Sequence, residues 1–140
     1  GHLSALVELT LERNRLTELS EDFGSLAKLE KLHLQDNQLR DLPDSFGRLV
    51  ALRSLRLEGN ELGMLPQDFG QLEALEDLDL RRNKLCVLPD GFGDLARLQA
   101  LHLGGNELTV LPPGFGHLRA LGVADFTVSE IDGFWMLRET

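Results

Sequence analysis

Leucine recurs along the chain at spacings that change within each unit. Leu52 and Leu55 stand three residues apart, whereas Leu55 and Leu57 stand two apart. A three-residue step drifts around an α-helix and does not hold the single stripe of a 3.6-residue period. A two-residue step places alternate side chains on one face of a β-strand. The pattern therefore predicts a short strand in each unit, followed by a turn at the next asparagine, such as Asn60.

The same phrase returns every 23 residues, and the unit reads LxxLxLxxNxLxxLPxxFGxLxx. Proline presets φ and needs no hydrogen-bond donor, so Leu-Pro is expected to open a returning arm. The Phe-Gly pair is expected to pack inward from the outer side on a short 3₁₀ or α turn. Because one unit cannot bury its apolar face alone, neighbours should stack into a curved solenoid. The recurring residues are Asn14, Asn37, Asn60, Asn83 and Asn106; Phe23, Phe46, Phe69, Phe92 and Phe115; Gly24, Gly47, Gly70, Gly93 and Gly116; and Pro43, Pro66, Pro89 and Pro112.

The asparagine column has a structural explanation. Backbone groups at each turn would be buried without partners, and a side-chain amide can both donate and accept hydrogen bonds. A file of buried asparagines can therefore satisfy neighbouring turns. N-glycosylation is excluded, because the residue two places after every asparagine of this column is a leucine and never Ser or Thr.

The unit resembles the leucine-rich repeat. Its LPxxFGxLxx half is similar to the 23-residue subtype of Ras-suppressor-like intracellular signalling scaffolds. The resemblance covers nearly the whole chain and implies a single α/β domain over residues 1–140: a right-handed leucine-rich repeat solenoid with a parallel concave sheet and short 3₁₀ or α turns on the convex side. It also implies a non-catalytic module without a cofactor, which binds another protein on the concave face in signalling or scaffolding. Such a motif is far more specific for fold than for function.

Composition and charge narrow the partner classes. The net charge of −9 argues against nucleic acid, whose phosphates need a basic surface, and against anionic membrane surfaces. No apolar run approaches the roughly 18 residues of a membrane span. Cys86 is the only cysteine, so no internal disulfide can form. This suits a reducing compartment, and a cytoplasmic location is expected.

The candidate binding residues lie between the strand leucines, where side chains should point to the concave face. Aligning the units places Arg56 opposite Asp79 and Glu58 opposite Arg81 on neighbouring strands. Arg56, Arg81 and Arg82 are expected to be the main contacts, because arginine is enriched at binding hot spots. Gly104 and Gly105 are expected to leave a bare patch. The full predicted site is Lys31, His33, Arg56, Glu58, Asp77, Asp79, Arg81, Arg82 and His102.

Catalytic and metal chemistry are not indicated. His33 and His102 should lie three strands apart, on the order of 14 Å, too far to share a metal ion. Asp79, His102 and Asp125 form a weak candidate for a metal site, and an ion-paired histidine is the commoner arrangement. Cys86 stands away from the histidine columns, so no cysteine nucleophile is indicated.

The two ends depart from the repeat. Ser20 replaces proline in the first arm, which should make that arm looser. Residues 121–140 are interpreted as a degenerate sixth unit after about five regular ones, with Ser129 in the place of asparagine. In this unit Ala124 and Phe126 replace leucines, Ile131 and Phe134 continue the core, and Trp135 and Met136 close the last layer.

Other interpretations remain open. The chain could be a fragment of a longer protein, or a small protein that self-associates through its uncapped ends. In function, it could be the substrate-recognition segment of a larger enzyme, such as a kinase, a GTPase or a ubiquitin ligase. A designed repeat array is a third possibility, which the uneven concave columns disfavour.

Overall fold

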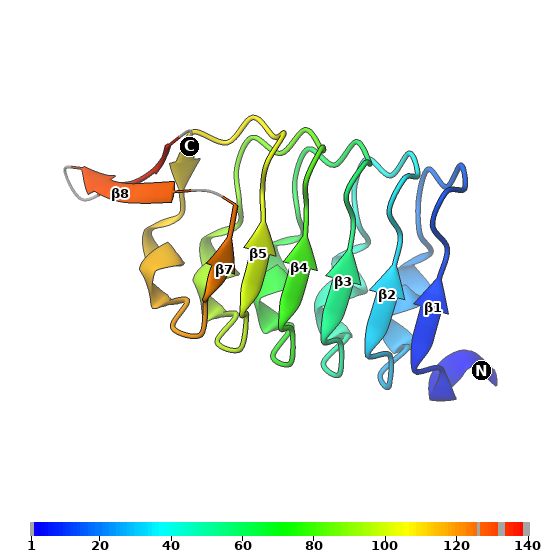
Figure 1. Ribbon diagram of the computed structural model, residues 1–140. Helices are drawn as coiled ribbons and strands as arrows, with labels where there is room; N and C mark the ends of the chain where they lie inside the picture. The colour runs from blue at the N-terminus through cyan, green and yellow to red at the C-terminus, as the bar shows by residue number, and fades with distance from the viewer. Residues whose placement is uncertain (1, 126, 132–133, 139–140) are drawn as a thin grey trace.

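The structure, a computed structural model, describes the backbone of residues 2–125, 127–131 and 134–138 and the side chains of residues 3–125. Six short strands form one parallel sheet in the order β1-β2-β3-β4-β5-β7 (Figure 1). Partners between β1 and β5 are 23 residues apart, for example Leu9, Leu32 and Leu55. The predicted solenoid and its register are therefore confirmed. The strands are β1 (Glu8–Thr10), β2 (Lys31–His33), β3 (Ser54–Arg56), β4 (Asp77–Asp79), β5 (Ala100–His102) and β7 (Val123–Ala124).

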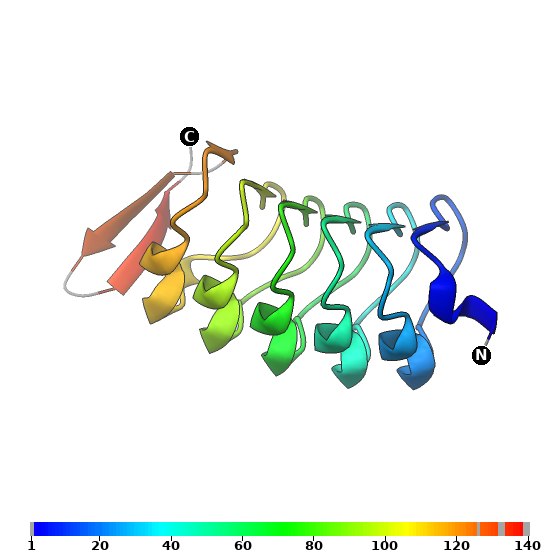
Figure 2. The same ribbon diagram turned by 90° about the horizontal axis from the view of Figure 1, so that it is seen from below.

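A row of 3₁₀ turns lies on the side opposite the sheet (Figure 2). In four units, a proline with extended backbone precedes the turn, as at Pro43 with φ −63° and ψ 149°. Ser20 has nearly the same conformation, φ −62° and ψ 146°, and its side chain accepts a hydrogen bond from the Asp22 amide at 3.1 Å. Ser20 therefore adopts the backbone conformation of the prolines that it replaces. The turns are η1 (His2–Ala5), η2 (Glu21–Ser25), η3 (Asp44–Arg48), η4 (Gln67–Gln71), η5 (Asp90–Asp94) and η6 (Pro113–His117).

The Phe-Gly pair locks one 3₁₀ turn against the next. Neighbouring phenylalanine rings stack with centroids 6.0 to 6.4 Å apart and nearly parallel planes, which confirms their inward packing. The glycine is needed for close approach: a Cβ at Gly70 would lie 2.0 Å from the carbonyl oxygen of Gly91 in the next unit. Any larger residue would push the units apart.

The asparagine file satisfies the turns as expected. Asn60 is buried, and its Nδ2 donates to the carbonyls of Leu34 and Leu57, both at 3.0 Å. Its Oδ1 accepts from the amide of Leu39 at 3.0 Å. Each internal asparagine thus joins its own rung to the preceding one. The prediction of a buried structural column is confirmed for Asn37, Asn60 and Asn83, whereas Asn106 is half-buried and Asn14 is exposed.

The C-terminal segment begins a sixth rung with β7 and then leaves the solenoid. After the two residues of β7, the chain forms strands β8 (Thr127–Ile131) and β9 (Phe134–Arg138), which pair antiparallel with each other. Strand β9 also pairs antiparallel with β6 (Val110–Leu111) in the fifth arm. Ser129 lies opposite Met136 in this hairpin and does not occupy an asparagine-type turn, so that prediction is wrong.

The hairpin has a simple physical reason. Serine lacks the side-chain amide that hydrogen-bonds the backbone at the other turns. The backbone of this segment therefore forms its hydrogen bonds by strand pairing. Phe126 lies outside the described residues. The side chains of Ile131, Phe134, Trp135 and Met136 lie outside the described residues as well.

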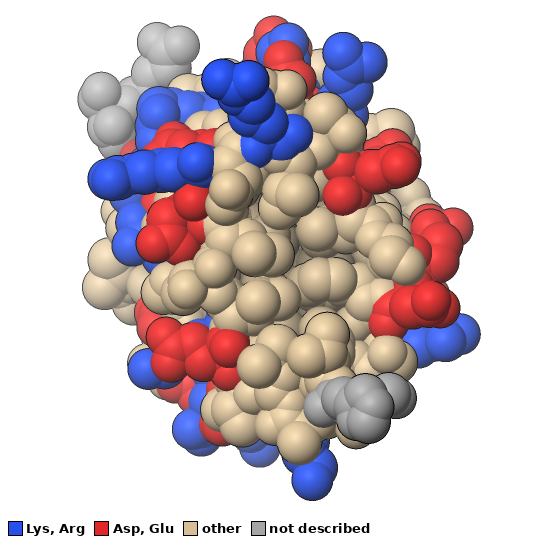
Figure 3. All heavy atoms as spheres, turned by 90° about the vertical axis from the view of Figure 1, so that its right-hand side faces the viewer, with Lys and Arg blue, Asp and Glu red and all other residues tan. Residues whose placement is uncertain are grey.

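The two ends of the apolar core differ in exposure. Leu9 and Leu11 of the first rung are only half-buried, whereas Leu32 in the next rung is fully buried. Figure 3 looks onto this first rung and shows an uncharged centre with acidic and basic residues around its rim. At the opposite end, Leu111 and Phe115 are only 2% and 4% exposed. On β7, the other edge strand of the parallel sheet, Val123 is 57% exposed.

Candidate functional site

A polar hollow of about 590 Å³ lies where the strands of the parallel sheet pass into their turns. Residues predicted to face the concave side lie next to one another here, because the sheet register aligns equivalent positions of neighbouring rungs. Four of the predicted site residues line it: Arg56, Glu58, Arg81 and Arg82. The other lining residues are Glu12, Arg13, Gln35, Asp36 and Gly104.

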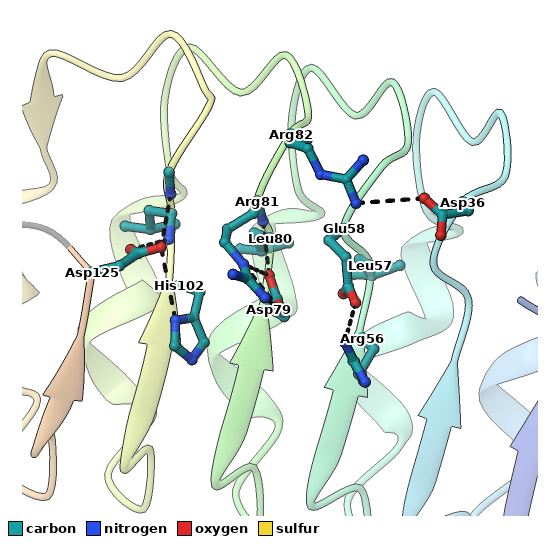
Figure 4. Close-up of polar contacts among 12 residues, drawn as sticks. Asp36, Arg56, Leu57, Glu58, Asp79, Leu80, Arg81, Arg82, His102 and Asp125 are labelled. Carbon is teal, nitrogen blue, oxygen red and sulfur yellow. Dashed lines mark hydrogen bonds and ion pairs between the residues drawn. The ribbon is translucent and has the colours of Figure 1, made fainter.

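Arg56 is held by a carboxylate of its own chain segment. Its Nη2 donates to Oε1 of Glu58, and the guanidinium side chain is 44% exposed while the Glu58 side chain is only 6% exposed (Figure 4). The second oxygen of Glu58, Oε2, is buried without a donor among the described residues. The arginine therefore presents one edge outward over an acid that lies beneath it.

Arg81 repeats this arrangement on the next rung. Its Nε and Nη2 donate to the carboxylate of Asp79 at 3.0 and 2.6 Å, and its backbone amide donates to the same group at 3.1 Å. Burial acts to raise the pKa of Asp79, but the Arg81 hydrogen bonds and charge outweigh it and hold that pKa below its ordinary value. Asp79 therefore stays ionised as a fixed anchor for the arginine.

These contacts correct the predicted pairing. Arg56 does lie opposite Asp79 in the register, but its hydrogen bond goes to Glu58, two residues along the same strand and its extension. Residues i and i+2 share one face of an extended chain, so a long arginine can reach either partner. Asp79 is already occupied by four hydrogen bonds from Arg81, which leaves Glu58 for Arg56.

Arg82 spans two rungs. Its Nη2 lies 3.5 Å from Oδ1 of Asp36, and both side chains are exposed (Figure 4). Arg82 and Asp36 have positive φ angles of 56° and 59°, and Gly59 between them has 74°. A Cβ at Gly59 would lie 2.3 Å from Oδ1 of Asp36, so the bridge requires glycine at that position. The column that was interpreted as concave surface is a row of left-handed turn residues.

His102 is paired with an acid from the last parallel strand region. Its Nδ1 lies 3.7 Å from Oδ2 of Asp125. The same carboxylate accepts from the amides of Leu103 at 2.8 Å and Gly104 at 3.4 Å. Gly104 is therefore covered in part by Asp125, and Gly105 meets a backbone requirement with φ 74°. The predicted bare patch is therefore narrowed by Asp125 at Gly104, whereas Gly105 is exposed as expected.

The remaining predicted residues lie along the strands and do not line the hollow. Lys31 and Asp77 are exposed, and His33 is half-buried. Asp36, Gln35, Glu12 and Arg13 line the hollow but were not among the predicted site residues. The alignment contained a signal for Asp36, because Asp36, Gly59 and Arg82 share one column with the smallest residue in the middle.

The described residues contain neither a candidate metal-ion cluster nor a membrane-spanning helix. No group of three or more His, Cys, Asp or Glu side chains there is arranged to hold a metal ion. None of the helices in the described part of the chain has the length and apolar character to cross a membrane.

Comparison with known families decides the classification. A family model described as leucine rich repeat matches residues 4–62, and a second, described as leucine-rich repeat region, matches residues 44–129. This chain belongs to the leucine-rich repeat family. Domains of the family generally mediate protein–protein interactions and are typically non-catalytic. No curated protein matches the chain.

Solved structures of bacterial leucine-rich repeat proteins share the architecture. An internalin of Listeria monocytogenes is 25% identical with a TM-score of 0.75, over 89% of this chain and 36% of that one. A leucine-rich repeat protein of Leptospira interrogans is 30% identical with a TM-score of 0.54, over 87% of this chain and 43% of that one. The chain thus spans less than half the length of either protein.

Proposed function

We propose that this leucine-rich repeat domain holds a partner protein against its concave face, with Arg56, Arg81 and Arg82 as the central contacts. One observation carries the proposal: two of these arginines are about half exposed, while the carboxylates that bind them are nearly buried. A role in signalling or scaffolding, in the cytoplasm, follows from the similarity to Ras-suppressor-like repeats and from the free, exposed thiol of Cys86.

Carboxylates buried beneath exposed arginines favour binding, because they already immobilise the arginine side chains and so reduce the entropy lost when a partner binds. A free arginine loses about 2 kcal/mol of rotamer entropy when it is immobilised. The guanidinium of Arg81 is already fixed by three hydrogen bonds to Asp79, so a partner would meet a preordered group. Among the described residues, Nη1 of Arg81 donates to no acceptor, which leaves it available for a carboxylate or carbonyl of the partner.

The charge of the hollow points to a partner of mixed polarity. Its arginines and carboxylates are equal in number once Asp79 is included, so no strong net field attracts one sign of charge. Recognition should therefore depend on position more than on long-range attraction, with a weak dependence on salt. The eight groups are Arg13, Arg56, Arg81, Arg82, Glu12, Asp36, Glu58 and Asp79.

The rival function is substrate recognition within a larger enzyme. It is favoured by one fact: similar solved chains are more than twice as long as the part that this domain matches. The same concave contacts would serve either role, so the test separates them by the identity of the captured protein and of the full gene product.

The experiment has two steps. A photo-crosslinking amino acid at Asp77, exposed on β4, should capture the partner, whereas the same label at Asp68 in η4 on the convex side should not. The captured protein is then purified, and its affinity for the domain is measured by calorimetry.

Simple charge reversal is a poor variant for the second step, because it would set new carboxylates against buried Glu58 and Asp79. Paired removal avoids this: Arg56→Gln with Glu58→Gln, together with Arg81→Gln with Asp79→Asn. We expect at least a hundredfold loss of affinity. The matched control removes an exposed pair outside the hollow, Arg40→Gln with Glu61→Gln, whose atoms lie 3.9 Å apart. Equal affinities for both folded variants would disprove the proposed site.

A further inference from the structure

The polar hollow contains two buried oxygen atoms that accept no hydrogen bond from the described residues. They are Oε1 of Gln35 and Oε2 of Glu58. Both residues line the hollow, and the side chain of Glu58 is only 6% exposed. Buried polar side-chain atoms of folded proteins nearly always have a hydrogen-bond partner, because an unpaired acceptor has lost its hydration without compensation. The two oxygens therefore mark a place where a bound group would supply the missing donor.

The two oxygens belong to equivalent positions of neighbouring rungs. Gln35 and Glu58 are 23 residues apart, and the amide of Asp36 donates to the carbonyl of Glu58 at 2.9 Å, which holds the two backbones side by side. Neighbouring strands lie about 4.8 Å apart, and the two side chains have the same length. One tetrahedral nitrogen that donates two hydrogen bonds of about 2.8 Å spans acceptors about 4.6 Å apart. The spacing of the rungs thus matches a single nitrogen with at least two N–H donors.

The arginines of the hollow do not supply this donor. Arg56 donates to Oε1 of Glu58 and leaves Oε2 of the same carboxylate without a partner among the described residues (Figure 4). Arg81 donates to Asp79, and Arg82 lies toward an acid of the second rung. An ionised carboxylate accepts at both of its oxygens. Glu58 therefore retains capacity for a second donor.

We propose that Gln35 and Glu58 bind the ammonium group of a lysine side chain of the partner protein, which donates to Oε1 of Gln35 and to Oε2 of Glu58. This inference rests on the proposed function and names the chemistry that its concave site recognises. An ammonium group has three N–H donors, whereas a hydroxyl or a backbone amide has one. A side-chain amide has two donors but no charge, and charge makes a hydrogen bond to a carboxylate roughly twice as strong.

The distribution of charge along the stack agrees with a cation at this place. In the two columns of turn residues that line the hollow, the second and third rungs contribute two carboxylates, Asp36 and Glu58, and no base. The fourth rung contributes Arg81 and Arg82. A lysine of the partner fits the second and third rungs, and a carbonyl or carboxylate of the partner fits Nη1 of Arg81. The hollow therefore orients the partner along the stack.

Access to the two oxygens requires the movement of a side chain, because both atoms are buried in the free domain. The side chain of Arg56 is 44% exposed and Gln35 is half-buried, so both have a solvent side toward which they can rotate. Rotamer changes of exposed side chains take picoseconds to nanoseconds. The site therefore opens without a change in the backbone.

The first test titrates the isotope-labelled domain with Nα-acetyl-lysine amide and follows its NMR signals. We expect a saturable shift of the side-chain amide signal of Gln35. Two control compounds separate charge from hydrogen bonding: the Nε-trimethyl form keeps the charge but has no N–H donor, and the norleucine analogue lacks both. Each should bind at least fivefold more weakly. The absence of a saturable shift at Gln35, or equal affinity for the trimethyl form, would overturn the proposal.

Two glutamine variants test the same binding from the side of the domain. Gln35→Met should weaken the lysine compound at least fivefold. Gln38→Met is the matched control, because Gln38 is exposed on the same rung and lines a separate hollow, and it should leave the affinity unchanged. Gln35→Glu should strengthen binding, since the ammonium group would then meet a second carboxylate.

The competing arrangement is internal to the chain. If the amide of Gln35 is turned by 180°, its Nε2 can donate to Oε2 of Glu58 and no ligand is needed. Gln35→Met would then lower the free energy of unfolding of the free domain relative to Gln38→Met and leave the affinity for the lysine compound unchanged. That pair of results would refute the proposal.

The partner captured through Asp77 separates this inference from the proposed function. Gln35→Met should weaken its binding at least tenfold relative to Gln38→Met. If the partner binds both variants equally but loses affinity for the variant with paired arginine removal, the concave site stands and the lysine is refuted. If affinity survives in that variant too, both proposals fail. Carbamylating only the partner's N-terminal amine should change nothing, and a loss of affinity there would assign the ammonium group to the chain terminus and refute the lysine.

Discussion

Replacing Asn60 by alanine tests the asparagine file directly. The side chain makes three hydrogen bonds to buried backbone groups: it donates to Leu34 O and Leu57 O and accepts from Leu39 N, all at 3.0 Å. Alanine would leave the amide of Leu39 buried without a partner, whereas the carbonyls of Leu34 and Leu57 would lose one of two donors and keep the bonds from Asn37 and Asn83. The leucine side chains around them are completely buried, so water has little access without local opening.

The expected cost follows from these contacts. The unpaired Leu39 amide costs about 1–3 kcal/mol, and each lost bond to a carbonyl that keeps another donor costs about 0.5–1.5 kcal/mol. Allowing for partial hydration, Asn60→Ala should lower the free energy of unfolding by roughly 2–5 kcal/mol. This is a large share of the roughly 5–15 kcal/mol that holds a typical domain folded. A variant in the middle of the stack should also weaken the coupling between its two halves and broaden the transition.

Asn14 supplies the matched control. It is the same residue at the equivalent position of the first rung, and its Nδ2 donates at 2.9 and 3.2 Å to two carbonyls. However, these bonds are exposed, so water replaces them in the Asn14→Ala variant. We expect a loss of about 1 kcal/mol or less, since exposed hydrogen bonds contribute little net free energy.

Urea unfolding followed by circular dichroism measures both variants. Asn60→Asp is a second test variant. It keeps the acceptor for Leu39 N but places negative charge against the carbonyls of Leu34 and Leu57. It should cost at least as much as alanine. If Asn60→Ala and Asn14→Ala lose the same free energy, burial of the amide is not what makes the file stabilising, and the reasoning fails.

Three further predictions rest on single contacts. Gly70→Ala should lower the free energy of unfolding by about 1–3 kcal/mol, because its Cβ would lie 2.0 Å from the next rung's carbonyl oxygen. In the control Gly63→Ala, the Cβ meets nothing within 4 Å, and the loss should be no more than about 0.5 kcal/mol. Thermal unfolding of both variants compares the two losses. The pKa of Asp79 is lowered on folding, so its contribution to stability is complete above the ordinary value of 3.8 and is lost as the pH falls through the folded pKa. Asp79→Asn should therefore cost more at about pH 7 than at about pH 3 in urea titrations. The hydrogen bond from Cys86 to Glu107 raises the thiol pKa, so Glu107→Ala should lower that pKa and speed alkylation by iodoacetamide at about pH 8.

The rungs were predictable from the repeat, because each recurring residue meets the same structural requirement in every unit. Asparagine supplies donors and an acceptor to a buried turn, phenylalanine fills the space behind it, and glycine permits the next backbone to approach. Asn37, Asn60 and Asn83 are accordingly all buried with the same set of partners. The register of the concave residues followed from the same 23-residue step.

The ion pairs were less predictable, because they depend on competition between neighbours. Arg56 has one acid across the sheet, Asp79, and another two residues ahead, Glu58. Alignment alone favours the partner across the sheet, since strands lie about 4.8 Å apart. Arg81 determines which acid Arg56 binds, because its own bidentate hydrogen bonds already occupy Asp79. Such competition cannot be read from a column of residues.

The C-terminal hairpin was missed for a different reason. Residues 121–124 still resemble the start of a unit, and β7 does join the parallel sheet. The chain leaves the solenoid after β7 because β9 pairs with β6, a two-residue segment of the fifth arm. Nothing in the local pattern of Val110 and Leu111 marks that arm as the one that accepts a partner.

The left-handed turn column connects the fold to the proposed site. Glycine meets a positive φ without strain, and Gly59 and Gly105 occupy it in two rungs. Arg13, Asp36 and Arg82 adopt the same conformation with φ between 56° and 59°, which is uncommon for residues with a Cβ. Glycine would serve the backbone better in all three places, and all three line the hollow. Backbone strain that is kept only where a charged side chain faces the hollow favours a role for that charge in binding, because folding alone would select glycine.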